Sequence, residues 1–397
     1  MSGNQREMER REKRANKEKK QKRIVWIILA VIVLALAVMK VCEINVNSIK
    51  NHFTDENGDF TLTEGVVEDA FPYSIDSSGK VSIVNINNKL GVITPSSFSV
   101  LNSSDAEIEY TFEHGYSNPI LKTAGIYSLV YDQGAKNFRL DTVNSSVYEE
   151  ECANTLLCAD VSKNGNVVYA STSKMRLCDI CVFNKSLKSL YSESISDGYV
   201  ISIALSENGR KIAYAVVSGE NANLVTTVYA FDIASDTQCF DAVVLAQGSL
   251  IDLNFSGNNI FVVGDSYAGV IKKSGEYNEI FEQGSISTAC NCYTPSGDLV
   301  IAYSSYSNSS ENVIAHIKPS ASVKCEIKVN GNVKSVSASS SLVSVLTGSS
   351  ILNYNLSNGE LKYELKTDDS AKMNCIMGSD VFVHKQSVIE RCGDDND

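Results

Sequence analysis

The stretch "LSENGRKIAYAV", residues 205–216, decides how the rest of the chain is read. It contains a short strand, a polar turn with Gly209 at its centre, and a second strand of mostly apolar residues, which is the pattern of a β-hairpin. Similar stretches begin at Ile75 ("IDSSGKVSIVNI"), Val161 ("VSKNGNVVYAST") and Tyr293 ("YTPSGDLVIAYS"), and looser copies at Leu121, Phe255 and Ile376. Because the stretch recurs, we interpret it as part of a repeating scaffold.

The repeat has a regular length. The expected turn residues, with a mean spacing of about 43 residues, are Gly79, Gly125, Gly165, Gly209, Gly257, Gly297, Ser340 and Gly378. Each hairpin is followed by a third strand, a polar turn and a fourth strand, as in "SILNYNLSNGELKYEL" at 350–365. Four strands in a repeat of this length make one blade of a β-propeller. A two-sheet sandwich is disfavoured, because its strands would not recur in fours at this period.

The count of turns predicts an all-β propeller of about eight four-stranded blades, with seven blades as the alternative. The eighth repeat ends after about three strands, so another segment must complete its blade. "GDFTLTEG" at 58–65 offers that edge strand, and such closure removes an exposed sheet edge. We therefore expect a stalk and possible ring-closing strand at 43–68, the propeller at 69–392 and an acidic tail at 393–397.

The N-terminal part of the sequence predicts a membrane anchor. Residues 1–23 hold ten Lys or Arg against four Glu, and residues 24–39 are sixteen apolar residues without a break. The run extends to Cys42 if Lys40 reaches the membrane interface, which makes 24–42 a transmembrane helix. The excess of Lys and Arg before it predicts a cytoplasmic tail at 1–23 and a propeller outside the cell membrane.

Two other interpretations of this apolar run remain open. "ALA" at 35–37 resembles a signal-peptidase site, although no polar region precedes it. A lipid anchor on Cys42 is weaker, because Met39, Lys40 and Val41 do not supply the small residue that such processing needs. An uncleaved single-pass anchor remains the preferred interpretation.

The charge and cysteine content restrict the possible partners. Residues 41–397 carry 24 Lys and Arg against 43 Asp and Glu, so the body is strongly acidic. This balance argues against nucleic acid as a partner and leaves a protein or another envelope component. The chain has 11 cysteines at irregular spacing, and we expect most of them to be buried thiols.

Patterns typical of metal or redox sites are incomplete. "DENGDFTLTEG" at 55–65 imitates a calcium loop, but Phe60 replaces the required glycine and Val66 the required glutamate. Cys178 and Cys181 of "CDIC" should lie on opposite faces of a strand. The pair Cys290 and Cys292 shares a face, yet two thiols do not make a tetrahedral site. No two of the four histidines, which are His52, His114, His316 and His384, lie at a ligand spacing.

One loop is a candidate interaction surface. Its residues are His114, Gly115, Tyr116, Ser117, Asn118 and Pro119. Asn118 and Pro119 mark a turn, and they are expected to fix the entry of the chain into the second blade. His114 and Tyr116 are expected to pack between blades. The alternative is that the loop contacts a partner at one end of the propeller.

The repeat and two further motifs carry a resemblance to known families. The hairpin resembles the "S-P-D-G-x-x-I-A-Y" hairpin of WD40-like propellers of the TolB type, although the only tryptophan, Trp26, cannot form a blade's Trp-Asp pair. "FPYSI" at 71–75 and "HGYSNPILK" at 114–122 are similar to a bacterial family of membrane-anchored propellers of unknown function. The resemblance implies fold and topology, and it transfers no catalytic residue.

These observations predict a membrane-anchored, extracytoplasmic propeller that acts as a binding or scaffolding module for a protein or envelope partner. No catalytic, cofactor-binding or metal-binding residue is predicted, and no cofactor. A hydrolase or lyase with residues gathered at the channel mouth is the alternative. An envelope sensor is a third possibility, although a tail of 23 residues leaves room only for docking.

Overall fold

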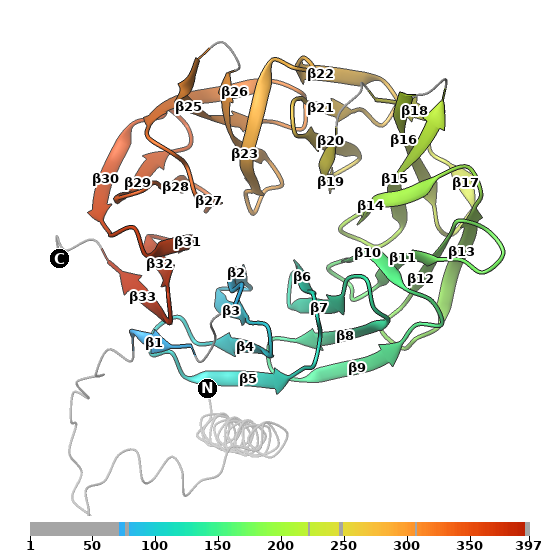
Figure 1. Ribbon diagram of the computed structural model, residues 1–397, viewed down its shortest axis with the longest axis horizontal. Coiled ribbons are helices and arrows are strands. Elements are labelled where there is room, and N and C mark those ends of the chain that lie inside the picture. Colours follow the sequence, from blue (N-terminus) through green and yellow to red (C-terminus); the bar gives the residue numbers. More distant parts are fainter. Residues whose placement is uncertain (1–70, 76–78, 221–222, 246–248, 306–307, 394–397) are drawn as a thin grey trace, which may run out of the picture. The chain divides into compact units, whose positions relative to one another are not determined.

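The computed structural model describes residues 71–75, 79–220, 223–245, 249–305 and 308–393. In this part the chain forms strands only, and they group into eight sheets arranged around one axis (Figure 1). The fold is an eight-bladed β-propeller, which confirms eight blades over seven. The described residues contain no helix that is long and apolar enough to cross a membrane, and residues 24–42 lie outside them.

Each blade is one antiparallel sheet whose strands follow the chain from the axis outward, except that the outermost strand of blade eight comes from the N-terminal side. Blade one contains β2 (Ser82–Ile86), β3 (Lys89–Ile93), β4 (Ser97–Leu101) and β5 (Ile108–Glu113). Blade two contains β6 (Pro119–Ala124), β7 (Tyr127–Asp132), β8 (Asn137–Thr142) and β9 (Ser146–Glu151). Blade three contains β10 (Leu156–Val161), β11 (Val167–Thr172), β12 (Cys178–Phe183) and β13 (Ser189–Ile195). Blade four contains β14 (Tyr199–Leu205), β15 (Lys211–Glu220), β16 (Asn223–Asp232), β17 (Thr237–Gln238) and β18 (Val243–Val244).

The second half of the ring repeats this order. Blade five contains β19 (Leu250–Ser256), β20 (Asn259–Gly264), β21 (Ala268–Ile271) and β22 (Tyr277–Phe281). Blade six contains β23 (Ile286–Tyr293), β24 (Leu299–Ser305), β25 (Asn308–Ile317) and β26 (Val323–Asn330). Blade seven contains β27 (Ser335–Ala338), β28 (Leu342–Leu346), β29 (Ser350–Asn355) and β30 (Leu361–Lys366). Blade eight contains β31 (Ala371–Met377), β32 (Asp380–Lys385), β33 (Val388–Cys392) and β1 (Tyr73–Ser74).

The ring is closed by a strand from the N-terminal side, but not by the one we expected. Tyr73 pairs with Ile389 and Ser74 with Val388, so β1 holds the fourth position of blade eight. Residues 58–65 lie outside the described residues. Phe71 and Ile75, which flank β1, are buried in the apolar cluster between blades eight and one, so a strand of two residues is held in place.

Seven of the eight expected hairpin turns lie between the first two strands of a blade, and the one at Gly79 does not. Gly79 precedes β2, and the turn of blade one is formed by Asn87 and Asn88, both with positive φ. Asparagine adopts this left-handed conformation more readily than most residues, so the turn needs no glycine.

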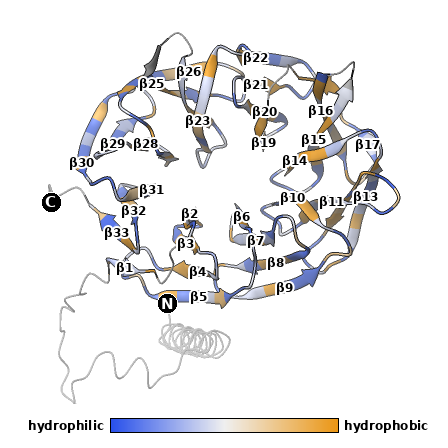
Figure 2. Cartoon of the chain, in the orientation of Figure 1, coloured by the Kyte–Doolittle hydropathy of each residue, from blue (hydrophilic) through white to orange (hydrophobic). Residues whose placement is uncertain are grey.

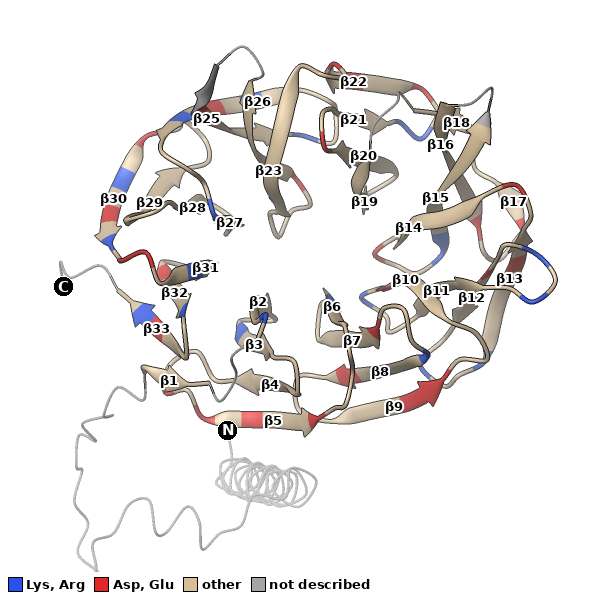
Figure 3. Cartoon of the chain, in the orientation of Figure 1, with Lys and Arg blue, Asp and Glu red and all other residues tan. Residues whose placement is uncertain are grey.

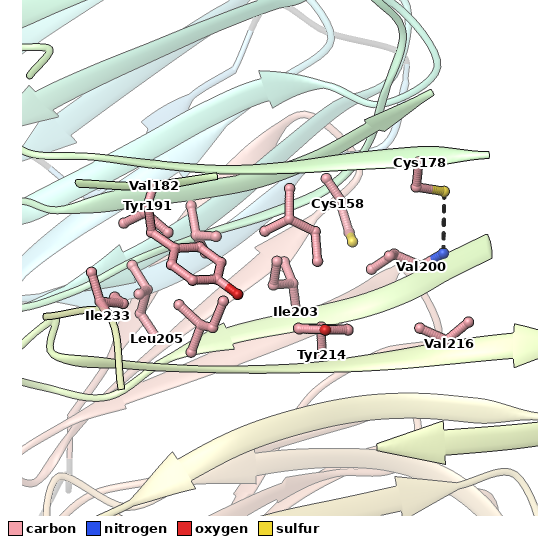
Figure 4. Packing of buried hydrophobic residues seen from close by; sticks show 14 residues of the cluster. Cys158, Cys178, Val182, Tyr191, Val200, Ile203, Leu205, Tyr214, Val216 and Ile233 are labelled. Atoms are coloured by element: carbon pink, nitrogen blue, oxygen red, sulfur yellow. Dashed lines mark hydrogen bonds between the residues drawn. The ribbon is translucent and has the colours of Figure 1, made fainter. Parts of the chain in front are cut away.

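The core lies between the blades rather than inside them. Eight apolar clusters of buried residues each combine side chains from two neighbouring blades. Figure 4 shows the cluster between blades three and four, where Leu205 and Tyr214 of the opening stretch pack with Cys158 and Val182 of blade three. A blade therefore buries both faces only when both neighbours are present, which is why the strands require a closed ring.

Candidate functional site

Exposed apolar residues lie at both ends of the propeller, and at one end they gather on three neighbouring blades. We call the end at which the innermost strands begin the entry end; the loop from each blade to the next lies there. Six exposed apolar residues lie at this end of blades three to five, and we call them the entry-end patch: Met175, Tyr199, Ile201, Leu224, Val244 and Ile251. Met175 is 93% exposed and Leu224 is 72% exposed. Figure 2 shows hydrophobic residues on β14, the innermost strand of blade four.

A recurring backbone irregularity contributes to this surface. Five innermost strands each contain one unpaired residue near the entry end, where the register to the second strand shifts. These bulge residues are Leu157, Ile201, Ile251, Ala289 and Lys372. Bulges are common near binding sites because they redirect a side chain. On blades three to five the bulge residue is leucine or isoleucine, and Ile201 and Ile251 are exposed although they belong to innermost strands.

The rim of the patch is mainly acidic. Glu151, Asp197, Asp265 and Glu282 are exposed in the loops or strand ends at the entry end. Lys174 and Arg176, which flank Met175, are exposed basic residues of the same surface, and Lys136 lies near Glu151. Figure 3 shows the acidic residues at the end of β9. The surface therefore combines exposed apolar side chains with a net negative rim.

Further along the axis, innermost strands bring three charged side chains together. Burial alone would lower the pKa of Lys122 on β6, but the carboxylates of Asp252 and Asp160 raise it above its ordinary value. Lys122 therefore stays an ammonium and is not a nucleophile or base near neutral pH. Burial raises the pKa of Asp160 to about 6, while Lys122 acts in the opposite direction.

Both carboxylates also connect neighbouring blades. The backbone N–H of Leu205 donates to Oδ2 of Asp160 over 2.8 Å, which links blade four to blade three. Asp252 of blade five accepts hydrogen bonds from Asn291 (3.0 Å) and from the Tyr293 hydroxyl (2.8 Å) of blade six. The two carboxylates therefore support the ring, and the raised pKa of Asp160 makes it a candidate for proton transfer.

The loop at 114–119 has the structural role that the sequence predicted. Pro119 begins β6, and Asp132 accepts hydrogen bonds from the backbone N–H groups of Ser117 (3.0 Å) and Asn118 (2.8 Å). Tyr116 is buried between blades one and two, and the ring of His114 stacks on it at 4.8 Å. Ser117, Asn118 and Gly115 are exposed, so contact with a partner through this loop remains a prediction.

The predicted cysteine pairs lie on the expected strands. Cys178 is buried between blades three and four, where its Sγ is 3.4 Å from the Val200 backbone N, and Cys181 lies on the opposite face of β12. Cys290 and Cys292 are on the innermost strand β23, and burial raises the pKa of both thiols. Among the residues described, no group of three or more His, Cys, Asp or Glu is placed to hold a metal ion.

Sequence reasoning did not find the entry-end patch or its bulges. The signal was present in "YVISIAL" and "LIDLNF", where adjacent apolar residues break the alternation expected of a strand. Such a break predicts a bulge only after the strand and its partner are known.

Solved β-propellers resemble this fold at low sequence identity. The C-terminal WD40 domain of Sif2 has a TM-score of 0.57 and 10% identity, covering 81% of this chain and 99% of that one. KlAtg21, in complex with the coiled coil of AgAtg16, has a TM-score of 0.52 and 14% identity, covering 75% and 100%. BamB from Moraxella catarrhalis has a TM-score of 0.50 and 9% identity, covering 80% and 97%. At these identities the likeness shows the fold alone.

Sequence comparisons add one finding. No curated protein matches the chain. The model of a family of unknown function, DUF5711, matches residues 68–391, which include every strand described above except the last residue of β33.

Proposed function

The chain belongs to the DUF5711 family of unknown function, and we propose that its propeller is a protein-binding module whose contact surface is the entry-end patch. The observation that carries this proposal is the concentration of six exposed apolar residues at one end of three neighbouring blades. Contiguous exposed apolar surface with a polar rim is typical of protein interaction sites.

The surface also indicates the chemistry of the partner. Exposed apolar side chains such as Met175, Leu224 and Ile251 fit an apolar segment, and methionine adapts to partners of different shape. The acidic rim at Asp197, Asp265 and Glu282 favours a partner whose apolar segment is flanked by Lys or Arg. The complex of KlAtg21 with a coiled coil is an example of a propeller of similar fold bound to a protein segment.

We also propose that residues 24–42 anchor the protein in the cell membrane with residues 1–23 in the cytoplasm. The support is the sequence: sixteen apolar residues preceded by ten Lys or Arg. Protease added to intact cells should then remove the propeller and leave a short membrane-bound fragment. A protected propeller would contradict this topology.

Site-specific crosslinking tests the binding surface. A photoreactive residue at position 251 of the full-length protein, in its own membrane, should crosslink to a discrete partner. The same residue at position 361 should not, because Leu361 is equally exposed but lies at the opposite end, at the start of β30. Ile251→Asp and Leu224→Asp should abolish the crosslink made from position 199, and Leu361→Asp should not. Equal crosslinking from both ends would refute the proposal.

The charges on the innermost strands favour a second candidate, an enzyme of hydrolase or lyase type. The observation is Asp160, whose pKa of about 6 suits a proton donor or acceptor near neutral pH. Ester, glycoside and uronate substrates should be screened with the wild type and with Asp160→Asn in parallel. Turnover by the wild type that Asp160→Asn abolishes would support this candidate. Equal turnover by both proteins, or turnover by neither, would contradict it and favour the binding module.

A further inference from the structure

A row of polar residues crosses blade seven on the face that packs against blade eight. Ser337, Ser344 and Asn353 are successive cross-strand partners on β27, β28 and β29. From blade eight, the Nδ2 atom of Asn374 donates to the carbonyl oxygen of Ser344 (3.0 Å) and to its hydroxyl (2.9 Å). The same interface contains an apolar cluster that includes Leu346, Ile351, Ile376, Val381 and Val383.

Three polar atoms in this row have no hydrogen-bond partner among the described residues. They are Oδ1 and Nδ2 of Asn353 and Oδ1 of Asn374. Asn353 is 0% exposed and Asn374 is 1% exposed, so bulk water does not reach them. A buried polar group without a partner is unfavourable, and native proteins pair the great majority of such groups with protein or with ordered water. Exchanging N and O of Asn353 does not resolve this, because both atoms are unpartnered.

The two asparagines lie on either side of Ser344. Asn353 is its cross-strand neighbour, at the short side-chain separation of such pairs, and Asn374 is hydrogen-bonded to it directly. The amide of Asn353 and the free oxygen of Asn374 therefore share Ser344 as a neighbour.

We propose that one ordered water molecule is bound between blades seven and eight by Asn353 and Asn374. The water accepts a hydrogen bond from Nδ2 of Asn353 and donates its two hydrogens to Oδ1 of Asn353 and Oδ1 of Asn374. These three hydrogen bonds are the usual number for a buried water, and they pair all three atoms. The site takes water rather than an ion, because its free atoms are neutral and offer one donor and two acceptors.

A crystal structure of the wild-type propeller tests the site directly. At a resolution that shows ordered solvent, a single peak should lie about 3 Å from all three amide atoms. A direct contact between the two amides, or apolar side chains filling the position without solvent, would overturn the proposal.

Thermal unfolding of variants gives an independent test. Asn353→Leu and Asn374→Leu should each lower the melting temperature, and the double variant should be little worse than either, because each change already removes the shared water. Without a water, Asn353→Leu should raise the melting temperature, since it removes two unpaired polar atoms. Asn166→Leu is the matched control: Asn166 is a buried asparagine whose Nδ2 donates directly to the Gly209 carbonyl (3.2 Å). The fall in melting temperature caused by Asn166→Leu should add to the fall caused by Asn353→Leu. Additive effects of Asn353→Leu and Asn374→Leu would contradict a shared water.

Discussion

Oδ2 of Asp298 lies 2.9 Å from Nε2 of His316, and both side chains are buried. The other ring nitrogen of His316 lies 2.9 Å from the carbonyl oxygen of Leu356, so the imidazole links blade six to the last turn of blade seven. Lys318 also donates to Asp298 over 2.6 Å. In a ring without a covalent closure, polar links of this kind supplement the apolar contacts between blades.

Replacement of His316 by leucine should weaken the junction of blades six and seven. The change removes a buried side chain whose two ring nitrogens contact Asp298 and the Leu356 carbonyl oxygen. We expect a loss of about 2–4 kcal/mol in the free energy of unfolding, measured by urea denaturation. Lys163→Ala is the control, because the Lys163–Glu207 pair also links neighbouring blades but both side chains are exposed; its loss should stay below about 1 kcal/mol. Equal losses of stability in His316→Leu and Lys163→Ala would contradict the expectation that burial makes the His316 contacts more important.

Arg139 should be essential to the junction of blades one and two. Its Nε donates to the fully buried Asp141 over 2.9 Å, its Nη2 lies 2.7 Å from the Tyr110 hydroxyl, and its guanidinium stacks on Phe112 at 4.2 Å. Arg139→Met leaves a buried carboxylate with one fewer donor, so we expect a loss of about 3–5 kcal/mol. Arg139→Lys should recover only part of this, since lysine cannot make the same planar set of contacts. Complete recovery by lysine would show that charge alone suffices.

Two turn glycines separate backbone strain from contact between blades. Gly209 and Gly257 have similar φ values, +63° and +61°. A Cβ at Gly209 would lie 2.6 Å from Nδ2 of Asn166 in blade three, whereas no described atom lies within 4 Å of a Cβ at Gly257. Gly257→Ala should therefore cost about 1–2 kcal/mol from the backbone, and Gly209→Ala about 1–3 kcal/mol more. Chemical denaturation measures the loss in the free energy of unfolding for each variant. Equal losses would show that Asn166 moves aside at little cost.

Mild acid should destabilise the propeller through His384. This side chain is buried, and burial lowers its pKa more than the backbone of Gln386 raises it, with Lys372 acting in the same direction as burial. The unfolded chain therefore binds more protons than the folded one below a pH of about 6.5. Stability should fall as the pH decreases from this value, until it passes the lowered pKa of the folded state.

His384→Leu should raise stability at pH 8 and flatten its decline toward pH 5. Leucine suits the position, because the cross-strand neighbours Met373 and Ile389 belong to the apolar cluster between blades eight and one. Burial also lowers the pKa of His114, so part of the pH dependence should remain in the variant. Melting temperatures of both proteins across this range provide the measurement. If the variant loses as much stability in acid as the wild type does, His384 is not the cause of the acid sensitivity.

The repeating features of the fold could be predicted from the sequence, but the local departures from the repeat could not. Seven turns were located because a glycine or serine stands at a fixed place between two apolar runs. The turn at Asn87 and Asn88 was missed because asparagine replaces the glycine that the search followed. The closing strand β1 was missed because two residues are too few for any alternation to be visible.

The candidate site depends on relationships that a single sequence does not encode. The bulge at Ile251 follows from the register between β19 and β20, and the approach of Lys122 to Asp252 follows from the curvature of the ring. Apolar residues such as Leu224 look like core residues in the sequence, and only the extended hairpin of β15 and β16 exposes them.

The position of β1 has a mechanical consequence. The chain before Phe71 is covalently joined to the ring through the strand that closes it, and that strand is held by the pairs Tyr73–Ile389 and Ser74–Val388 and by the Ile75 N–H bond to Ser387. Tension on the N-terminal part of the chain would act on these few bonds before any other blade is loaded. Residues 71–75 therefore both close the ring and connect it to the N-terminal part of the chain.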